Sequence, residues 1–164
     1  MAKEHSMDIS VQFDSQELKN AVEMTRKEAT NRYDLKDSNV EIELFDDSIK
    51  ITTKSEMHVE SVYGILTKKM ISRGLSSKIF DRQNIQEIGG MRVRQEIKLI
   101  TVLDQDTSKD LSKKIREAFP KAKPIIQGNI LRVTSMSIDD LQAISQMLKA
   151  DEKIQVPLEF GNYR

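Results

Sequence analysis

The sequence predicts an α+β protein with two four-stranded antiparallel sheets, each covered on one face by two helices. Three observations lead to this prediction. Short stretches alternate apolar and polar residues, as half-buried strands do, and longer stretches repeat apolar residues at helical spacing. The pattern of the first half also returns in the second, because Ile49 and Val59 recur as Leu131 and Leu141, 82 positions further on.

The first half opens with an alternating stretch and a helix. Ile9, Val11 and Phe13 alternate with polar neighbours and predict a strand. The segment 14–17, Asp-Ser-Gln-Glu, matches a capping box, which satisfies free N–H groups at a helix start. The helix it opens is expected near 15–32. Its apolar face consists of Leu18, Ala21, Val22, Thr25 and Ala29.

A hairpin and a second helix follow. Segments 40–44 and 49–53 alternate around a turn at 46–48, which is typical of a hairpin. A helix near 56–73 places apolar residues on one face and ends at Gly74. Those residues are Val59, Val62, Leu66 and Met70. A short strand is expected near 78–81, and 83–90 is expected to be a connection that closes with two glycines.

The second half repeats the scheme. Segment 93–99 is expected to be extended, and Thr107–Asp110 to cap a helix near 107–119 that Pro120 ends. A hairpin follows with its turn at 127–129, then a helix near 137–149 opened by Ser137, and a last strand at 156–160. The apolar face of that helix includes Leu141, Ile144 and Leu148.

Each half therefore has the order strand, helix, strand, strand, helix, strand. This order suits an antiparallel sheet with both helices on one face, which is the ferredoxin-like βαββαβ arrangement. We expect one such domain over residues 1–88 and a second over residues 89–164. The sheet face opposite the helices is left open in each.

Composition excludes several classes of protein. The 164 residues contain no cysteine, which excludes disulfides and thiolate zinc sites, and two histidines, His5 and His58, which are too few for a multi-histidine metal centre. Neither a cofactor nor a metal site is expected. No apolar run approaches the roughly 18 residues of a membrane span, and no signal peptide precedes the first strand, so a cytoplasmic protein is expected.

The open sheet faces carry the candidate ligand-binding residues. Side-chain parity places six basic residues there, and basic side chains, arginine above all, suit phosphate contacts. They are Arg92, Arg94, Lys98, Lys50, Lys54 and Arg132. The alternative is an ordinary solvated face on which Glu41 and Glu43 pair with the lysines.

Other features of the sequence give weaker evidence of a function. Base stacking of RNA needs aromatic residues on the open face, and by parity only Phe45 points there. The basic segment 109–123 could contact a nucleic-acid backbone, but it is more often a solvated helix face. The pairs Asp46-Asp47 and Asp139-Asp140 could hold Mg²⁺, although a turn and a helix start explain them.

The sequence resembles the YajQ family of bacterial proteins over nearly its full length. The motifs that carry the resemblance are 16–22 (QELKNAV), 32–36 (RYDLK), 89–90 with 94–95, 126–128 (IQG), 132–134 (RVT), 139–142 (DDLQ) and 160–164 (FGNYR). The resemblance implies two ferredoxin-like domains with exchanged first strands, so that 91–100 completes the first sheet and 8–13 the second. The chain departs from the family pattern at 34–37, 99–103 and 135–139, where the loss of basic, glycine or aromatic residues predicts a weaker phosphate site.

The resemblance also implies a function. It points to a non-enzymatic, regulatory nucleotide-binding protein whose ligand is a nucleotide, a cyclic dinucleotide such as cyclic di-GMP, or RNA. The alternative is a regulatory protein-interaction module that binds no nucleotide and has a transcription regulator or a ribosome-associated protein as its partner. A third hypothesis is a Mg²⁺-dependent phosphoesterase that uses Asp46, Asp47 or Asp139.

Overall fold

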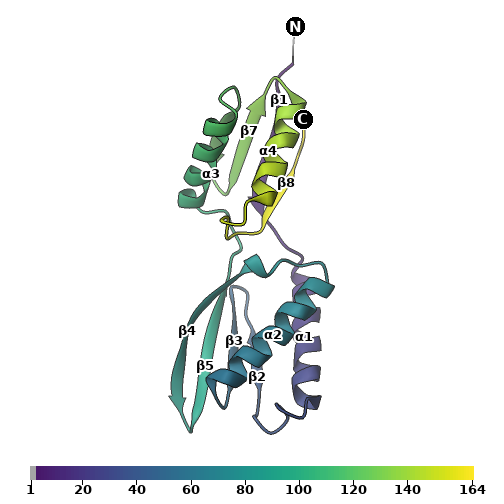
Figure 1. The fold of residues 1–164 in the computed structure, drawn as a ribbon, viewed down its shortest axis with the longest axis vertical. Coiled ribbons are helices and arrows are strands. Elements are labelled where there is room, and N and C mark those ends of the chain that lie inside the picture. The colour runs from purple at the N-terminus through teal and green to yellow at the C-terminus, as the bar shows by residue number, and fades with distance from the viewer. Residues whose placement is uncertain (1–2) are drawn as a thin grey trace. The chain divides into compact units, whose positions relative to one another are not determined.

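The computed structural model describes residues 3–164 and contains two compact units, each with a four-stranded antiparallel sheet (Figure 1). One unit is Phe13–Ile100. The other combines the residues up to Gln12 with Thr101–Arg164. In each unit the helices lie on one face of the sheet, so the predicted α+β fold class is confirmed.

The unit Phe13–Ile100 has the sheet order β2-β3-β5-β4. Helices α1 and α2 pack against each other and cover one face of this sheet. Its elements are α1 (Ser15–Asn31), β2 (Glu41–Leu44), β3 (Ser48–Thr53), α2 (Glu56–Ser72), a 3₁₀ turn (Ser77–Ile79), β4 (Phe80–Gly89) and β5 (Arg92–Leu99).

The other unit has the sheet order β6-β7-β1-β8. Its helices α3 and α4 contact strands of this sheet from one side. Its elements are β1 (His5–Val11), α3 (Gln105–Ala118), β6 (Lys123–Gln127), β7 (Ile130–Ser135), α4 (Ile138–Ala150) and β8 (Leu158–Gly161).

The two units have exchanged their first strands. Strand β5 is hydrogen-bonded between β3 and β4, and β1 between β7 and β8. Each sheet thus has the ferredoxin-like strand order. The strand in the central first position is β5, which follows β4 directly, in one sheet, and β1, from the N-terminal end of the chain, in the other. The exchange implied by the family resemblance is present in the strand pairing.

The core of each unit lies between its sheet and its helices. Strand positions that alternate with the open-face residues point to the helices, and Ile49, Ile51 and Ile97 are fully buried there. The predicted helix faces are confirmed. Val59, Val62, Leu66 and Met70 on α2, and Leu141, Ile144 and Leu148 on α4, are all buried.

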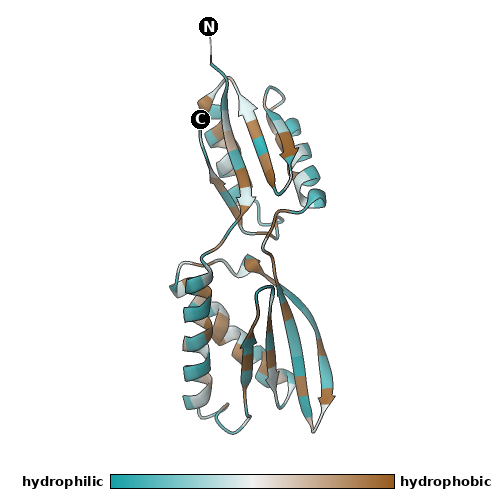
Figure 2. Cartoon of the chain, turned by 180° about the vertical axis from the view of Figure 1, so that it is seen from behind, coloured by the Kyte–Doolittle hydropathy of each residue, from teal (hydrophilic) through white to brown (hydrophobic). Residues whose placement is uncertain are grey.

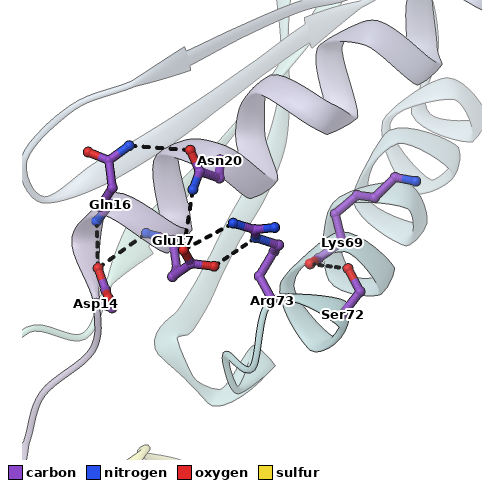
Figure 3. A network of polar contacts seen from close by, with 7 residues as sticks. All are labelled: Asp14, Gln16, Glu17, Asn20, Lys69, Ser72 and Arg73. Atoms are coloured by element: carbon purple, nitrogen blue, oxygen red, sulfur yellow. Dashed lines mark hydrogen bonds and ion pairs between the residues drawn. The ribbon is translucent and has the colours of Figure 1, made fainter.

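Polar contacts fix the ends of α1 and α2 against each other (Figure 3). Asp14 caps α1, because its Oδ1 accepts hydrogen bonds from the backbone N–H groups of Gln16 and Glu17 at 3.0 and 3.2 Å. Glu17 does not complete the capping box. Its carboxylate instead accepts from Arg73 Nε at 2.7 Å and Nη2 at 3.1 Å, which joins the end of α2 to the start of α1.

Two element predictions were wrong. Residues 83–90 belong mostly to the ten-residue strand β4 and not to a connection. An irregularity in pairing between Arg82 and Ile85 breaks the alternation by which a strand is recognised. Helix α3 begins at Gln105 and not at 107, because the cap is Asp104, whose Oδ1 accepts from the Thr107 N–H at 2.8 Å.

One further finding concerns the helices as a set. Within residues 3–164, no helix is both long enough and apolar enough to cross a membrane.

Removing the Leu141 side chain tests the assignment of the helix face on α4. Leu141 is 1% exposed, so Leu141→Ala should cost about 2–5 kcal/mol of unfolding free energy through lost burial and a residual cavity. The matched control is Ile125→Ala on the open face, where the side chain is 46% exposed and the expected change is small. Urea unfolding of both variants measures this, and equal midpoints would contradict the assignment.

Candidate functional site

The six predicted basic residues lie in three separate places. Lys50, Arg94 and Lys98 line one hollow on the open sheet face. Lys54 and Arg92 line a second cavity in the same unit. Arg132 lies on β7 of the other unit, so the structure does not bring it together with the other five.

The first of these places, here named the open-face hollow, spans strands β3, β5 and β4. It has a volume of about 430 Å³ and lies on the sheet face opposite α1 and α2. Figure 2 shows the chain from behind, where the long β4–β5 hairpin is largely hydrophilic. The lining residues are Lys50, Gln83, Asn84, Gln86, Arg94, Glu96 and Lys98.

A bulge in β4 explains the carboxamides of the hollow. Arg82 pairs with Ile97 and Ile85 with Gln95, so Gln83 and Asn84 together face the single residue Glu96. A bulge of this kind redirects side chains, and here both Gln83 and Asn84 line the hollow. The expectation that 83–90 is a connection did not predict these two residues or Gln86 as part of a site. The pairing of Gln86 with Arg94 could not be found without the register of β4.

Arg94 is the most firmly positioned cation of the hollow. Its Nε donates to Thr52 Oγ1 at 3.1 Å, and Thr52 is the residue paired with it on β3. Thr52 is only 1% exposed although it points to the open face. An uncharged acceptor leaves the guanidinium charge in place, so Arg94 is oriented without being neutralised.

The hollow has an excess of positive charge. Within the part of the chain that the structure describes, no carboxylate forms an ion pair with Lys50, Arg94 or Lys98. Three cations therefore stand against Glu96 among the lining residues. Two further carboxylates lie next to the hollow: Glu43 is opposite Lys50 on the neighbouring strand β2, and Asp81 is opposite Lys98 on the neighbouring strand β4. Such a site suits one compact anion better than a long polyanion.

The second cavity, here named the α2-start cavity, has a volume of about 540 Å³. Lys54, Ser55 and His58 line it from the start of α2, and Arg92 lines it from the start of β5. Arg92 Nη2 donates to the Asn39 carbonyl at 2.6 Å and to the Thr52 carbonyl at 3.5 Å. Arg92 and Arg94 lie on the same face of the sheet, but Arg92 lines the α2-start cavity and Arg94 lines the open-face hollow.

Arg132 is held by an ion pair in the other unit. Its Nε lies 2.9 Å from Asp8 Oδ1 and its Nη2 3.3 Å from Asp8 Oδ2, and Asn162 Nδ2 donates to the same carboxylate at 2.7 Å. These contacts, that of Arg132 above all, lower the pKa of Asp8 below its ordinary value. The charge of Arg132 is therefore balanced, and its predicted phosphate contact has no support in this geometry.

The remaining candidates are dispersed. On the basic segment 109–123, Lys114 pairs with Asp151 at 2.8 Å. Phe45 is exposed, and Lys50 Nζ lies 5.2 Å from the centre of its ring. Residues 3–164 contain no group of three or more histidine or carboxylate side chains that could hold a metal ion.

The geometry defines a class of protein: a tandem ferredoxin-like chain with exchanged central strands and a cationic hollow on an open sheet face. The family model for "Nucleotide-binding protein YajQ-like" matches residues 5–164, and the chain belongs to this family. A relative from Synechococcus sp. (strain JA-3-3Ab), named "Nucleotide-binding protein", is 48% identical over 164 residues and is matched over the whole of both chains. A relative of the same name from Roseiflexus sp. (strain RS-1) is 46% identical over 165 residues, again over the whole of both chains.

The lowered pKa of Asp8 predicts a pH-dependent contribution to stability. The folded pKa lies below the unfolded value of about 4, so the ion pair stabilises the fold above that value and is lost as the pH falls through the folded pKa. Asp8→Asn should therefore be less stable than wild type at pH 7, and the difference should shrink as the pH falls below about 4. Thermal unfolding of both proteins from pH 7 to pH 3 measures it, and a constant difference would contradict the assignment.

Proposed function

We propose that this protein binds a nucleotide, with the phosphate in the open-face hollow. The observation that carries the proposal is the convergence of Lys50, Arg94 and Lys98 without an ion-pair partner in residues 3–164. The names of the relatives, which state nucleotide binding, support it. Arg94 would contact phosphate oxygens through the guanidinium edge that Thr52 leaves free, and the lysines would act as point charges.

The carboxamides supply a second type of contact. Gln83, Asn84 and Gln86 each carry both a donor and an acceptor, and they line the β4 side of the same hollow. They can hydrogen-bond the base or the sugar once the cations hold the phosphate. The proposed role is binding without chemistry.

A nucleotide fits the hollow better than a longer RNA. Sequence-specific RNA recognition depends on stacking of bases on aromatic residues, and no aromatic residue lines the hollow. Its three cations against one carboxylate also match a single phosphorylated ligand. A regulatory role, and the choice between a linear and a cyclic ligand, remain predictions of the family resemblance.

Loss of Arg94 tests the site. A charge-assisted hydrogen bond contributes about 1.5–3 kcal/mol, so Arg94→Ala should weaken binding by about tenfold to a hundredfold. Thermal stability should change little, because the side chain lies on a partly solvated face. A thermal-shift panel of mononucleotides, dinucleotides, cyclic nucleotides and short RNA first selects the ligand, and calorimetry then compares the affinities.

Two control variants sharpen the experiment. Arg132→Ala and Lys113→Ala remove cations from the other unit, and neither should change the affinity. If Lys113→Ala abolishes binding while Arg94→Ala has no effect, the ligand binds at the basic helix α3 and the open-face hollow is wrong. If no member of the panel raises the thermal midpoint, the nucleotide proposal fails and the protein-interaction module is favoured instead.

A further inference from the structure

We propose that the α2-start cavity is a second anion site, and that it takes the phosphate group of a small phosphomonoester. The cavity shares no lining residue with the open-face hollow, so this inference does not depend on the proposed nucleotide site. In Figure 1 the tip of the β4–β5 hairpin, the start of α2 and the loop that follows α1 lie at the same end of the unit, and residues of all three line the cavity.

Arg92 is held in place with its charge intact. Both of its acceptors, the carbonyl oxygens of Asn39 and Thr52, are uncharged, and both bind Nη2. The Nε and Nη1 groups make no hydrogen bond to any residue between 3 and 164, so their N–H donors remain for an anion. A guanidinium held through Nη2 loses less entropy when a phosphate binds to its remaining N–H groups.

Lys54 supplies a second charge. Its side chain is exposed, and it takes part in no ion pair within the described chain. Lys54 directly follows β3, while Arg92 opens β5, so two neighbouring central strands deliver the two cations to the same cavity.

His58 adds a neutral donor. Its Nδ1 lies 2.6 Å from Ser55 Oγ, and the same oxygen accepts the His58 backbone N–H at 3.3 Å. When the Ser55 hydroxyl donates to Nδ1, the neutral ring carries its proton on Nε2. The ring then offers an N–H donor in the wall of the cavity.

The remaining lining limits the ligand to one phosphate group. Asp37 lies in the same wall and offsets one of the two permanent positive charges. Met91, which is 90% exposed at the hairpin tip, and Gly90 give the cavity an apolar side that suits a small organic group. A polyphosphate or a long polyanion would meet too little positive charge here.

Two lysine variants of the full chain separate this site from the open-face hollow. The probes are inorganic phosphate and phenyl phosphate, titrated while backbone amides are followed by NMR. Amides of Ser55, His58, Met91 and Arg92 should shift and saturate. Lys54→Gln should weaken this response by about tenfold, whereas the matched variant Lys50→Gln, which alters the open-face hollow, should leave it unchanged.

Three results would overturn the proposal. The first is the absence of saturable shifts at these four amides with either probe. The second is saturation with the same affinity in wild type and Lys54→Gln. The third is equal weakening by Lys50→Gln, which would mean that the two cavities are one site. The two proposals can fail separately. If Arg94→Ala lowers the nucleotide affinity and Lys54→Gln does not, the open-face site is supported even when the α2-start cavity binds no phosphate.

Discussion

The structure depends on the exchange of central strands between the two repeats. Strand β1, which opens the first repeat, pairs in the second sheet, and β5, which opens the second repeat, pairs in the first. Strand β5 is hydrogen-bonded on both sides, so it completes two ladders at once between β3 and β4. The same insertion assembles the open-face hollow. Arg94 on β5 lies between Thr52 on β3 and Gln86 on β4, in one row of paired residues. Without β5, the residues of β3 and β4 that line the hollow would not share a surface.

Because both helices lie on one face of the sheet, the hydrophobic core and the open-face hollow are on opposite faces. The buried isoleucines of β3 and β5 point to α1 and α2, and the free energy of burial is gained there. The other face contributes little to that core, so charged residues can stand on it at small cost to stability. Thr52 departs from this division. It is buried although it faces away from the helices, and its hydroxyl orients Arg94.

The sequence predicts the elements whose local signals are strong, and it fails where long-range pairing decides. Asp14 and Ser137 cap their helices as expected, and the repeat of apolar residues gives the helix faces correctly. The sequence did not predict strand β4 for two reasons. A bulge breaks its alternation of apolar and polar residues. In addition, a helix-facing position is occupied by the charged Arg82, which is satisfied by hydrogen bonds to Glu60 and Gln95 and lies over the Tyr63 ring. Side-chain parity places Arg92 and Arg94 on the same face, but it cannot predict that they line different cavities. It also cannot predict the ion pair of Arg132 with Asp8, which is distant in sequence.

The distribution of charge argues for recognition by contact and against long-range attraction. The chain has 26 basic and 26 acidic residues, and Glu43 and Asp81 stand beside the lysines of the hollow. At physiological salt the screening length is about 8 Å, so the balanced charges beyond the rim add little attraction. A ligand must therefore gain its affinity from direct contacts, and Arg94 is oriented for such a contact before any ligand arrives. The three carboxamides next to it offer both donors and acceptors, so hydrogen-bond matching to the organic part of the ligand would determine specificity.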